Sequence, residues 1–128
     1  MRYLIDPCSQ ASFVSNSLVE RLRLKLEKVN VSITGTGSEL VPATTKSARV
    51  CIKPHYKSDF SCDVDAYVLP KIPSYSPPSM KTILRLPYLN GLVLADSQYI
   101  DKGHIDVLLG ATVYSRILEG TVIKGGLQ

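Results

Sequence analysis

The sequence predicts an all-β fold: a closed barrel of short strands that carries two short helices. Three observations support this prediction. Several stretches alternate apolar and polar residues with a period of two, which is the spacing of a strand with one buried face. Turn-forming residues separate these stretches, since the chain contains eight glycines and eight prolines. Two other short stretches place apolar residues at helical spacing.

Two short strands are predicted at the beginning of the chain. Residues 2–5 are mostly apolar and end at Asp6. Pro7 then prevents a regular continuation of the strand, because proline fixes φ and has no N–H to donate. Residues 12–14 form the second short strand, so a polar loop connects the two.

A helix is predicted directly after the second strand. Either Ser15 or Ser17 can cap its first turn, and Ser17 with Glu20 three residues later matches a capping box. Three apolar residues then fall on one helical face: Leu18, Val19 and Leu22.

A hairpin with a glycine-rich tip follows in the sequence. Residues 29–34 alternate apolar and polar side chains and lead into the turn 35–38, whose glycines permit positive φ. Residues 48–53 alternate on the return strand, and 54–59 form a turn. Residues 60–68 are the longest period-two run in the chain, which predicts another strand with one buried face.

One domain, 1–128, is predicted, because 128 residues are enough to bury a core. Five of the eight prolines lie between residues 70 and 87. We therefore expect an irregular, proline-rich surface insertion at about 70–90.

The last third of the chain predicts further short elements. Residues 92–95 indicate a brief strand, and 105–109 a buried strand that ends at Gly110. A second short helix follows over 111–118, with apolar residues four apart on one face. Residues 121–123 are the last predicted strand.

Composition and charge favour a cytoplasmic protein that binds neither nucleic acid nor membrane. The formal net charge is +4, and the basic residues are scattered rather than clustered. No apolar run approaches the roughly 18 residues of a membrane span, and the beginning of the chain does not have the pattern of a signal peptide. The three cysteines are too few for a disulfide framework and are expected to be reduced, although Cys51 and Cys62 lie in neighbouring predicted strands.

Three features with chemical meaning occur in a fixed order along the chain. The first is an apolar strand that ends in an acid, followed by small polar residues, at 4–10. The second is the Gly-x-Gly turn on an alternating hairpin, at 32–40. The third is an apolar strand closed by glycine and a helix, at 105–118.

In this order the features resemble the retropepsin-like aspartic proteases, and most closely the peptidase-like domain of Pao/BEL-type retrotransposon polyproteins. The resemblance extends over most of the chain, including the segments 5–15, 17–25, 64–75 and 86–96. It implies a retropepsin-like barrel with a glycine-rich flap hairpin. It also implies that the chain is a fragment of a longer polyprotein, located in the cytoplasm or in retroelement particles.

The resemblance implies roles for five residues. Asp6 is the catalytic candidate, and Ser9 is placed to hydrogen-bond to its carboxylate and to contact substrate. Gly35, Thr36 and Gly37 form the flap tip, where backbone amides approach an extended peptide or polyprotein substrate. One catalytic aspartate per chain implies a homodimer, because the reaction of the aspartic proteases needs two carboxylates that share a proton.

The loop departs from the family pattern at two positions. The family has an Asp-Ser/Thr-Gly triplet, whose hydroxyl braces both catalytic loops across the dimer axis, whereas this chain has Asp6, Pro7 and Cys8. Two functions therefore stay open: an aspartic endopeptidase, or a degenerate dimerisation or peptide-binding module. No cofactor is expected, and no pair of cysteines or histidines has zinc-ligand spacing.

Overall fold

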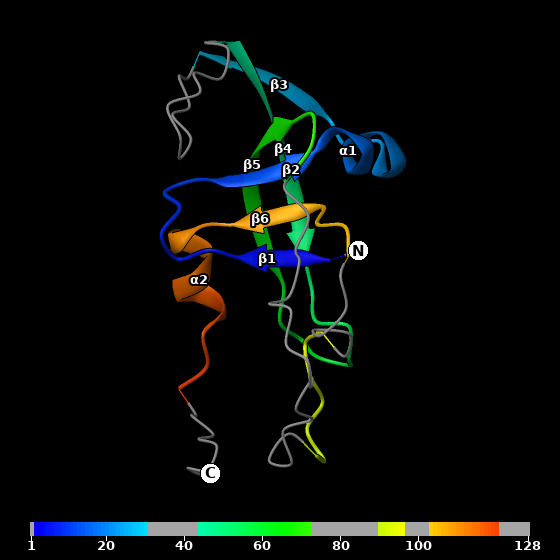
Figure 1. The fold of residues 1–128 in the computed structure, drawn as a ribbon, viewed down its shortest axis with the longest axis vertical. Helices are drawn as coiled ribbons and strands as arrows, with labels where there is room; N and C mark the ends of the chain where they lie inside the picture. The colour runs from blue at the N-terminus through cyan, green and yellow to red at the C-terminus, as the bar shows by residue number, and fades with distance from the viewer. Residues whose placement is uncertain (1, 31–43, 73–89, 97–102, 121–128) are drawn as a thin grey trace, which may run out of the picture.

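The computed structural model describes residues 2–30, 44–72, 90–96 and 103–120 (Figure 1). Within these ranges, six strands form one mixed sheet in the order β1-β6-β2-β5-β4-β3, accompanied by two short helices. The elements in chain order are β1 Tyr3–Ile5, β2 Ser12–Ser15, α1 Asn16–Leu22, β3 Leu26–Asn30, β4 Thr44–Ile52, β5 Cys62–Leu69, β6 Val107–Leu109 and α2 Ala111–Ile117.

The mainly β architecture with two short helices is confirmed, but the predicted closed barrel is wrong for the described strands. Closure requires the first and last strands of the sheet order to pair with each other. In the described ranges β1 pairs with β6, and β3 pairs with β4. These two edges lie on opposite sides of the sheet (Figure 1). β1 and β3 are the two edges of the described sheet, and no pairing among the described residues joins them.

The end of the sheet beside β1 is built from segments far apart in sequence. β6 lies between β1 and β2, parallel to the first and antiparallel to the second. β2 in turn pairs in parallel with β5. The loop from β1 to β2 therefore passes across the carboxyl end of β6.

The core consists of the inward-facing residues of the sheet together with one side of each helix. The alternation predicted in the two long strands is confirmed, because every second residue from Ala48 to Ile52 and from Cys62 to Ala66 is buried. Burial of one aliphatic side chain contributes about 1.5–3 kcal/mol. The remaining buried members of the main cluster are Val14, Leu18, Val19, Val107, Leu109 and Val113.

The helix α1 begins earlier than the capping-box pattern of Ser17 and Glu20 predicts. Ser15 is the N-cap, and its hydroxyl accepts a hydrogen bond from the amide of Leu18 at 3.3 Å. The alternative with Ser17 as the cap is wrong, because Ser17 lies inside the helix. Arg23 ends the helix in the left-handed region, with φ of 51°. Leu22, predicted on the buried face, is 48% exposed as a result of this early end.

Other predicted elements differ in their bounds or lie outside the described residues. Residues 92–95 are not a strand; they follow a turn in which Gly91 has φ of 83°. β3 begins at Leu26, earlier than predicted, and is described as far as Asn30. The flap turn 35–38, most of the insertion at 70–90 and the strand 121–123 lie outside the described residues.

The cysteines are free thiols in the structure. Cys51 is exposed and Cys62 is buried, because their register places them on opposite faces of β4 and β5. A disulfide between these two residues is therefore incompatible with this sheet.

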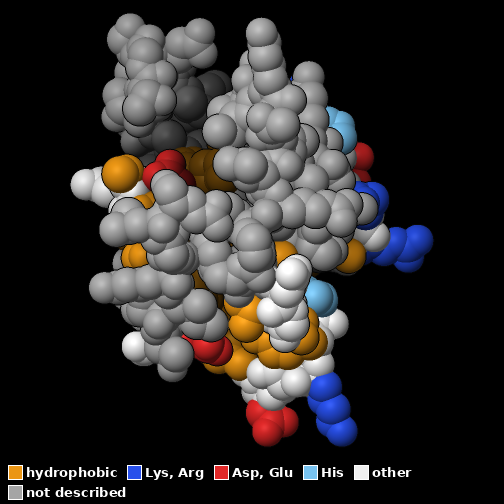
Figure 2. Space-filling model, turned by 60° about the horizontal axis from the view of Figure 1, so that its bottom comes forward, with side chains coloured by type: hydrophobic (Ala, Val, Ile, Leu, Met, Phe, Trp, Pro, Cys, Tyr) orange, Lys and Arg blue, Asp and Glu red, His pale blue; other side chains and the backbone are white. Residues whose placement is uncertain are grey.

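Hydrophobic side chains also reach the surface. Figure 2 shows such side chains gathered in the lower part of one face, with acidic and basic side chains at the rim. Among the described residues the large hydrophobic side chains that are exposed are Ile5, Leu22, Leu26, Tyr56, Phe60, Leu92, Val93 and Leu118. None of the helices in the described ranges has the length and apolarity to cross a membrane.

Candidate active site

Asp6 lies directly after β1, where the strand pairing with β6 ends. The last residue pair of the two strands is Ile5 with Leu109. The backbone N–H of Asp6 then donates to the carbonyl of Leu109 at 2.9 Å. This bond extends the pairing by one residue, so the backbone of Asp6 is fixed to the end of β6. Its side chain is half-buried.

The backbone of the following loop holds the Asp6 carboxylate. The amide of Cys8 donates to Oδ1 of Asp6 at 3.0 Å, and the amide of Ser9 donates to the Asp6 carbonyl at 3.1 Å. An aspartate that accepts from the amide two residues later forms an Asx-turn. Because Pro7 has no N–H, Cys8 supplies the first amide available to this carboxylate.

The side chain of Ser9 does not make the predicted contact. Its hydroxyl donates to the carbonyl of Ala11 at 2.6 Å. A serine hydroxyl has one proton to donate, and here that proton stabilises the loop rather than the Asp6 carboxylate. A role for Ser9 in substrate binding stays a prediction.

Gly110, which ends the predicted apolar strand 105–109, packs against the back of the loop. A Cβ atom at Gly110 would lie 2.6 Å from the carbonyl oxygen of Ala11 and 2.8 Å from that of Ser9. Both atoms belong to the backbone and cannot rotate away. A larger residue at this position would therefore displace the loop that carries Asp6.

Two hydrogen bonds reinforce this packing. The amide of Gly110 donates to the hydroxyl of Ser12 at 2.9 Å, and the amide of Ala111 donates to the carbonyl of Ser9 at 2.8 Å. With the bond from Asp6 to Leu109, they join the loop to three consecutive residues at the end of β6 and the beginning of α2. The predicted flap residues Gly35, Thr36 and Gly37 lie outside the described residues, so their relation to this loop stays a prediction.

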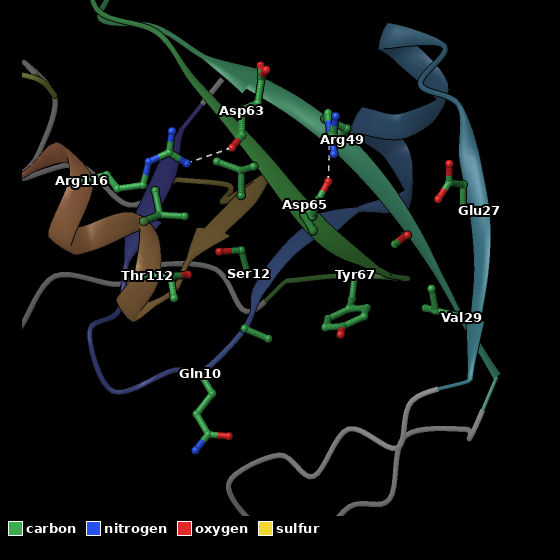
Figure 3. A pocket seen from close by; sticks show the side chains of 15 residues that line it. Gln10, Ser12, Glu27, Val29, Arg49, Asp63, Asp65, Tyr67, Thr112 and Arg116 are labelled. Atoms are coloured by element: carbon green, nitrogen blue, oxygen red, sulfur yellow. Dashed lines mark hydrogen bonds and ion pairs between the residues drawn. The ribbon is translucent and has the colours of Figure 1, made fainter.

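A groove of about 540 Å³ begins at the far end of the same loop (Figure 3). It is lined by Gln10, Ala11 and Ser12, by residues of β3, β4 and β5, and by α2. Glu27 from β3 lies on one side and Arg116 from α2 on the other. Asp6 does not line the groove, so the groove neighbours the candidate catalytic residue without including it.

The groove contains charged side chains of both signs. Nε of Arg49 donates to Oδ1 of Asp65 at 3.0 Å, and this hydrogen bond raises the pKa of the Arg49 guanidinium. Nη1 of Arg116 donates to the backbone carbonyl of Asp63 at 3.2 Å. The carboxylates of Asp63 and Glu27 also line the groove. The groove therefore contains hydrogen-bond acceptors as well as cationic donors.

This groove was not predicted from the sequence, although the pattern of residues 60–68 indicates one side of it. The alternation in residues 60–68 places Asp63, Asp65 and Tyr67 together on the outward face of β5. Solvent exposure alone accounts for such a pattern, so a concave surface could not be predicted from it. The contribution of α2 depends on the fold.

A second polar cluster lies where α1 meets the segment directly before β6. Oδ1 of Asp106 accepts from Nη2 of Arg21 at 3.1 Å, and the hydroxyl of Ser15 lies 3.4 Å from the same oxygen. The side chain of Asp106 is only 14% exposed. The cluster borders a cavity of about 250 Å³ that is also lined by Lys71 and His104. It connects the helix cap to the sheet.

The pKa of Tyr3 is raised above its ordinary value of 10.0. Burial against the core is the main cause, because it disfavours the charged phenolate. The negative charges of Cys51, when ionised, and of Asp106 act in the same direction.

The histidines do not join a metal-binding or catalytic cluster in the part of the chain that is described. Nε2 of His55 lies 2.5 Å from the carbonyl oxygen of Leu94, and its ring contacts Tyr56 edge-on. No three histidine, cysteine, aspartate or glutamate side chains gather in metal-binding geometry within these ranges.

Comparison of the chain with protein-family models, with curated proteins and with solved structures gives no match. Its function is therefore inferred from the residues and their geometry.

Proposed function

We propose that this chain is a retropepsin-like aspartic endopeptidase domain of the Pao/BEL retroelement type, which acts as a homodimer on an extended peptide or polyprotein. The observation that carries the proposal is the position of Asp6. It follows β1, its loop crosses the end of β6, and Gly110 packs behind that loop at backbone contact distance. This is the arrangement expected for a catalytic aspartate backed by a hydrophobic-hydrophobic-Gly strand.

The chemistry requires a second carboxylate. Peptide hydrolysis without a metal or a covalent nucleophile needs a base to activate water and an acid to protonate the leaving amine. Two carboxylates that share one proton supply both groups and titrate as a unit. Asp6 from a second copy, related by a two-fold axis, would complete the pair.

Surface features near Asp6 are compatible with a partner chain. Ile5 precedes Asp6 and is 46% exposed, although it is a large aliphatic residue. β1 is an edge strand in the described sheet, and an edge strand presents unpaired backbone groups to another chain. The flap at Gly35, Thr36 and Gly37 would then cover an extended substrate with strand-like backbone bonds.

The test is cleavage of fluorescein-labelled casein at mildly acidic pH, with the oligomeric state followed by sedimentation. Asp6→Asn should abolish cleavage, because an amide cannot act as the base or share the proton. Asp59→Asn, which changes an exposed acid in a turn, is the matched control and should cleave as the parent does. Equal cleavage by the parent and by Asp6→Asn would exclude Asp6 as the catalytic residue.

A second candidate function is peptide binding without hydrolysis. It is favoured by the groove next to the loop and by Pro7 and Cys8, which remove the hydroxyl brace and the permissive glycine. This module would dimerise and bind extended peptides but leave them intact. Fluorescence anisotropy with a lysine-containing extended peptide would detect it, and Glu27→Gln with Asp63→Asn should weaken that binding. Intact peptide after long incubation would distinguish this function from the first.

A further inference from the structure

Ser12 is one of two buried polar residues in the described core, and its burial needs a reason. The residue is 5% exposed at the beginning of β2, where it pairs with Ala66. A hydroxyl removed from water costs free energy unless it forms a hydrogen bond. An alanine, as at position 66 opposite, would avoid this cost. Ser12 is therefore expected to serve a specific partner.

That partner is the amide of Gly110. The N–H donates to Oγ of Ser12 at 2.9 Å, and Gly110 itself is buried. Without the hydroxyl, this buried amide would lose the hydrogen-bond acceptor that it has in the described structure. The bond thus fixes Gly110 where the backbone of the loop passes within contact distance of it.

The loop between Asp6 and Ser12 is consequently held at both ends. Asp6 is bonded to Leu109 at one end and Ser12 to Gly110 at the other. Between these two points the amide of Cys8 orients the carboxylate. All of these contacts form within a single chain. The hydroxyl that Pro7 lacks would instead form its hydrogen bond across the dimer axis, to a partner chain.

We propose that Ser12 is a positioning residue for Asp6, which holds the catalytic loop within one chain through Gly110. This inference rests on the proposed function for its effect on catalysis. It adds that a hydroxyl six residues after the aspartate stabilises the loop where the triplet itself has none. Ser12 does not contact the carboxylate, so it acts through the backbone of the loop.

The experiment compares Ser12→Ala, Ser12→Thr and the parent in the full chain by amide hydrogen exchange and by casein cleavage. In Ser12→Ala the amides of Gly110 and Asp6 should exchange about tenfold faster, the factor expected when one buried hydrogen bond is lost. The kcat should fall by about 10- to 100-fold as the carboxylate loses its position, while KM changes less than about twofold. Ser12→Thr keeps the hydroxyl and should restore both values.

The matched control is Ser115→Ala, in which an exposed serine loses a hydroxyl that donates to the carbonyl of Thr112 at 2.9 Å. It should leave both the exchange at Gly110 and the kcat unchanged. Unchanged exchange at Gly110 and Asp6 in Ser12→Ala would overturn the proposal, and so would a change confined to KM. If the parent does not cleave casein, the proposed function fails, whereas the exchange comparison still decides whether Ser12 holds the loop.

Discussion

The amide nitrogen of Asp6 lies 2.9 Å from the carbonyl oxygen of Leu109, so the beginning and the end of the described chain meet at the candidate catalytic residue. The contact exists because β6 lies between β1 and β2 and runs parallel to β1. Parallel neighbours end at the same edge of a sheet. The loop after β1 is therefore brought against the residues that follow β6. Changes near residue 110 should consequently affect the loop at residue 6.

Gly110→Ala should destabilise the protein by about 1–3 kcal/mol, the usual cost of forcing an extra group into a packed site. The added Cβ would lie 2.6 Å from the carbonyl oxygen of Ala11, a backbone atom that can move only together with the loop. The free energy of unfolding in urea measures the effect. Gly120→Ala is the matched control, because no atom lies within 4 Å of the added methyl group. Equal stability of the two variants would contradict the close packing behind the loop.

Ser15→Ala should reduce the free energy of unfolding by about 0.5–2 kcal/mol, the range found when a helix N-cap is removed. The hydroxyl of Ser15 accepts from the amide of Leu18 and lies near the carboxylate of Asp106, and the residue is buried. Chemical denaturation and the helical circular-dichroism signal would both report the loss. Ser17→Ala, which the capping-box prediction would make the more harmful change, should have the smaller effect. A larger loss in Ser17→Ala would show that the helix begins later.

The elements with clear periodicity could be predicted from sequence. The alternation around Val50 and Val64 determines which face of β4 and β5 is buried, because period-two spacing leaves only one way to cover the apolar side chains. α2 was predicted almost to its bounds, since Gly110 ends the preceding strand. Whether the sheet closes could not be predicted, because closure depends on which strands form the edges and whether those edges pair. Local patterns do not contain this information.

In the candidate site, too, some features could be predicted from the sequence and others could not. The position of Asp6 at a strand end follows from the local sequence, in which an apolar stretch ends at this residue directly before Pro7. The partner of the Ser9 hydroxyl does not, because the Asp6 carboxylate and the carbonyl of Ala11 are both within two or three residues of it. The bond from Gly110 to Ser12 joins residues far apart in sequence, so only the fold reveals it.

Stability should fall at alkaline pH, and Tyr3→Phe should reduce that fall. Burial raises the pKa of Tyr3 in the folded protein above its ordinary value of 10.0. Above that pH the unfolded chain releases the phenolic proton more readily than the folded chain, so the folded state binds more protons. The contribution of the Tyr3 phenol to the free energy of unfolding is therefore fully present below pH 10.0 and is lost as the pH rises through the folded-state pKa of Tyr3. Urea midpoints measured from about pH 9 to about pH 11 test this. Parallel profiles for the parent and Tyr3→Phe would contradict it.

Restoring the family triplet, with Pro7→Ser and Cys8→Gly together, should increase casein cleavage by about tenfold or more if the proposed function is correct. In the proposed homodimer the serine hydroxyl would bond across the two-fold axis, and the glycine can adopt conformations close to the carboxylate that Cys8 resists. Pro7→Ala with Cys8→Gly is the matched control, since it has the same backbone freedom but no hydroxyl. A gain in the serine variant alone would assign the effect to the brace, and adding Asp6→Asn should remove all cleavage. If the parent and the restored protein cleave equally, the contacts within one chain, from Asp6 to Leu109 and from Ser12 to Gly110, already hold the loop as firmly as catalysis requires.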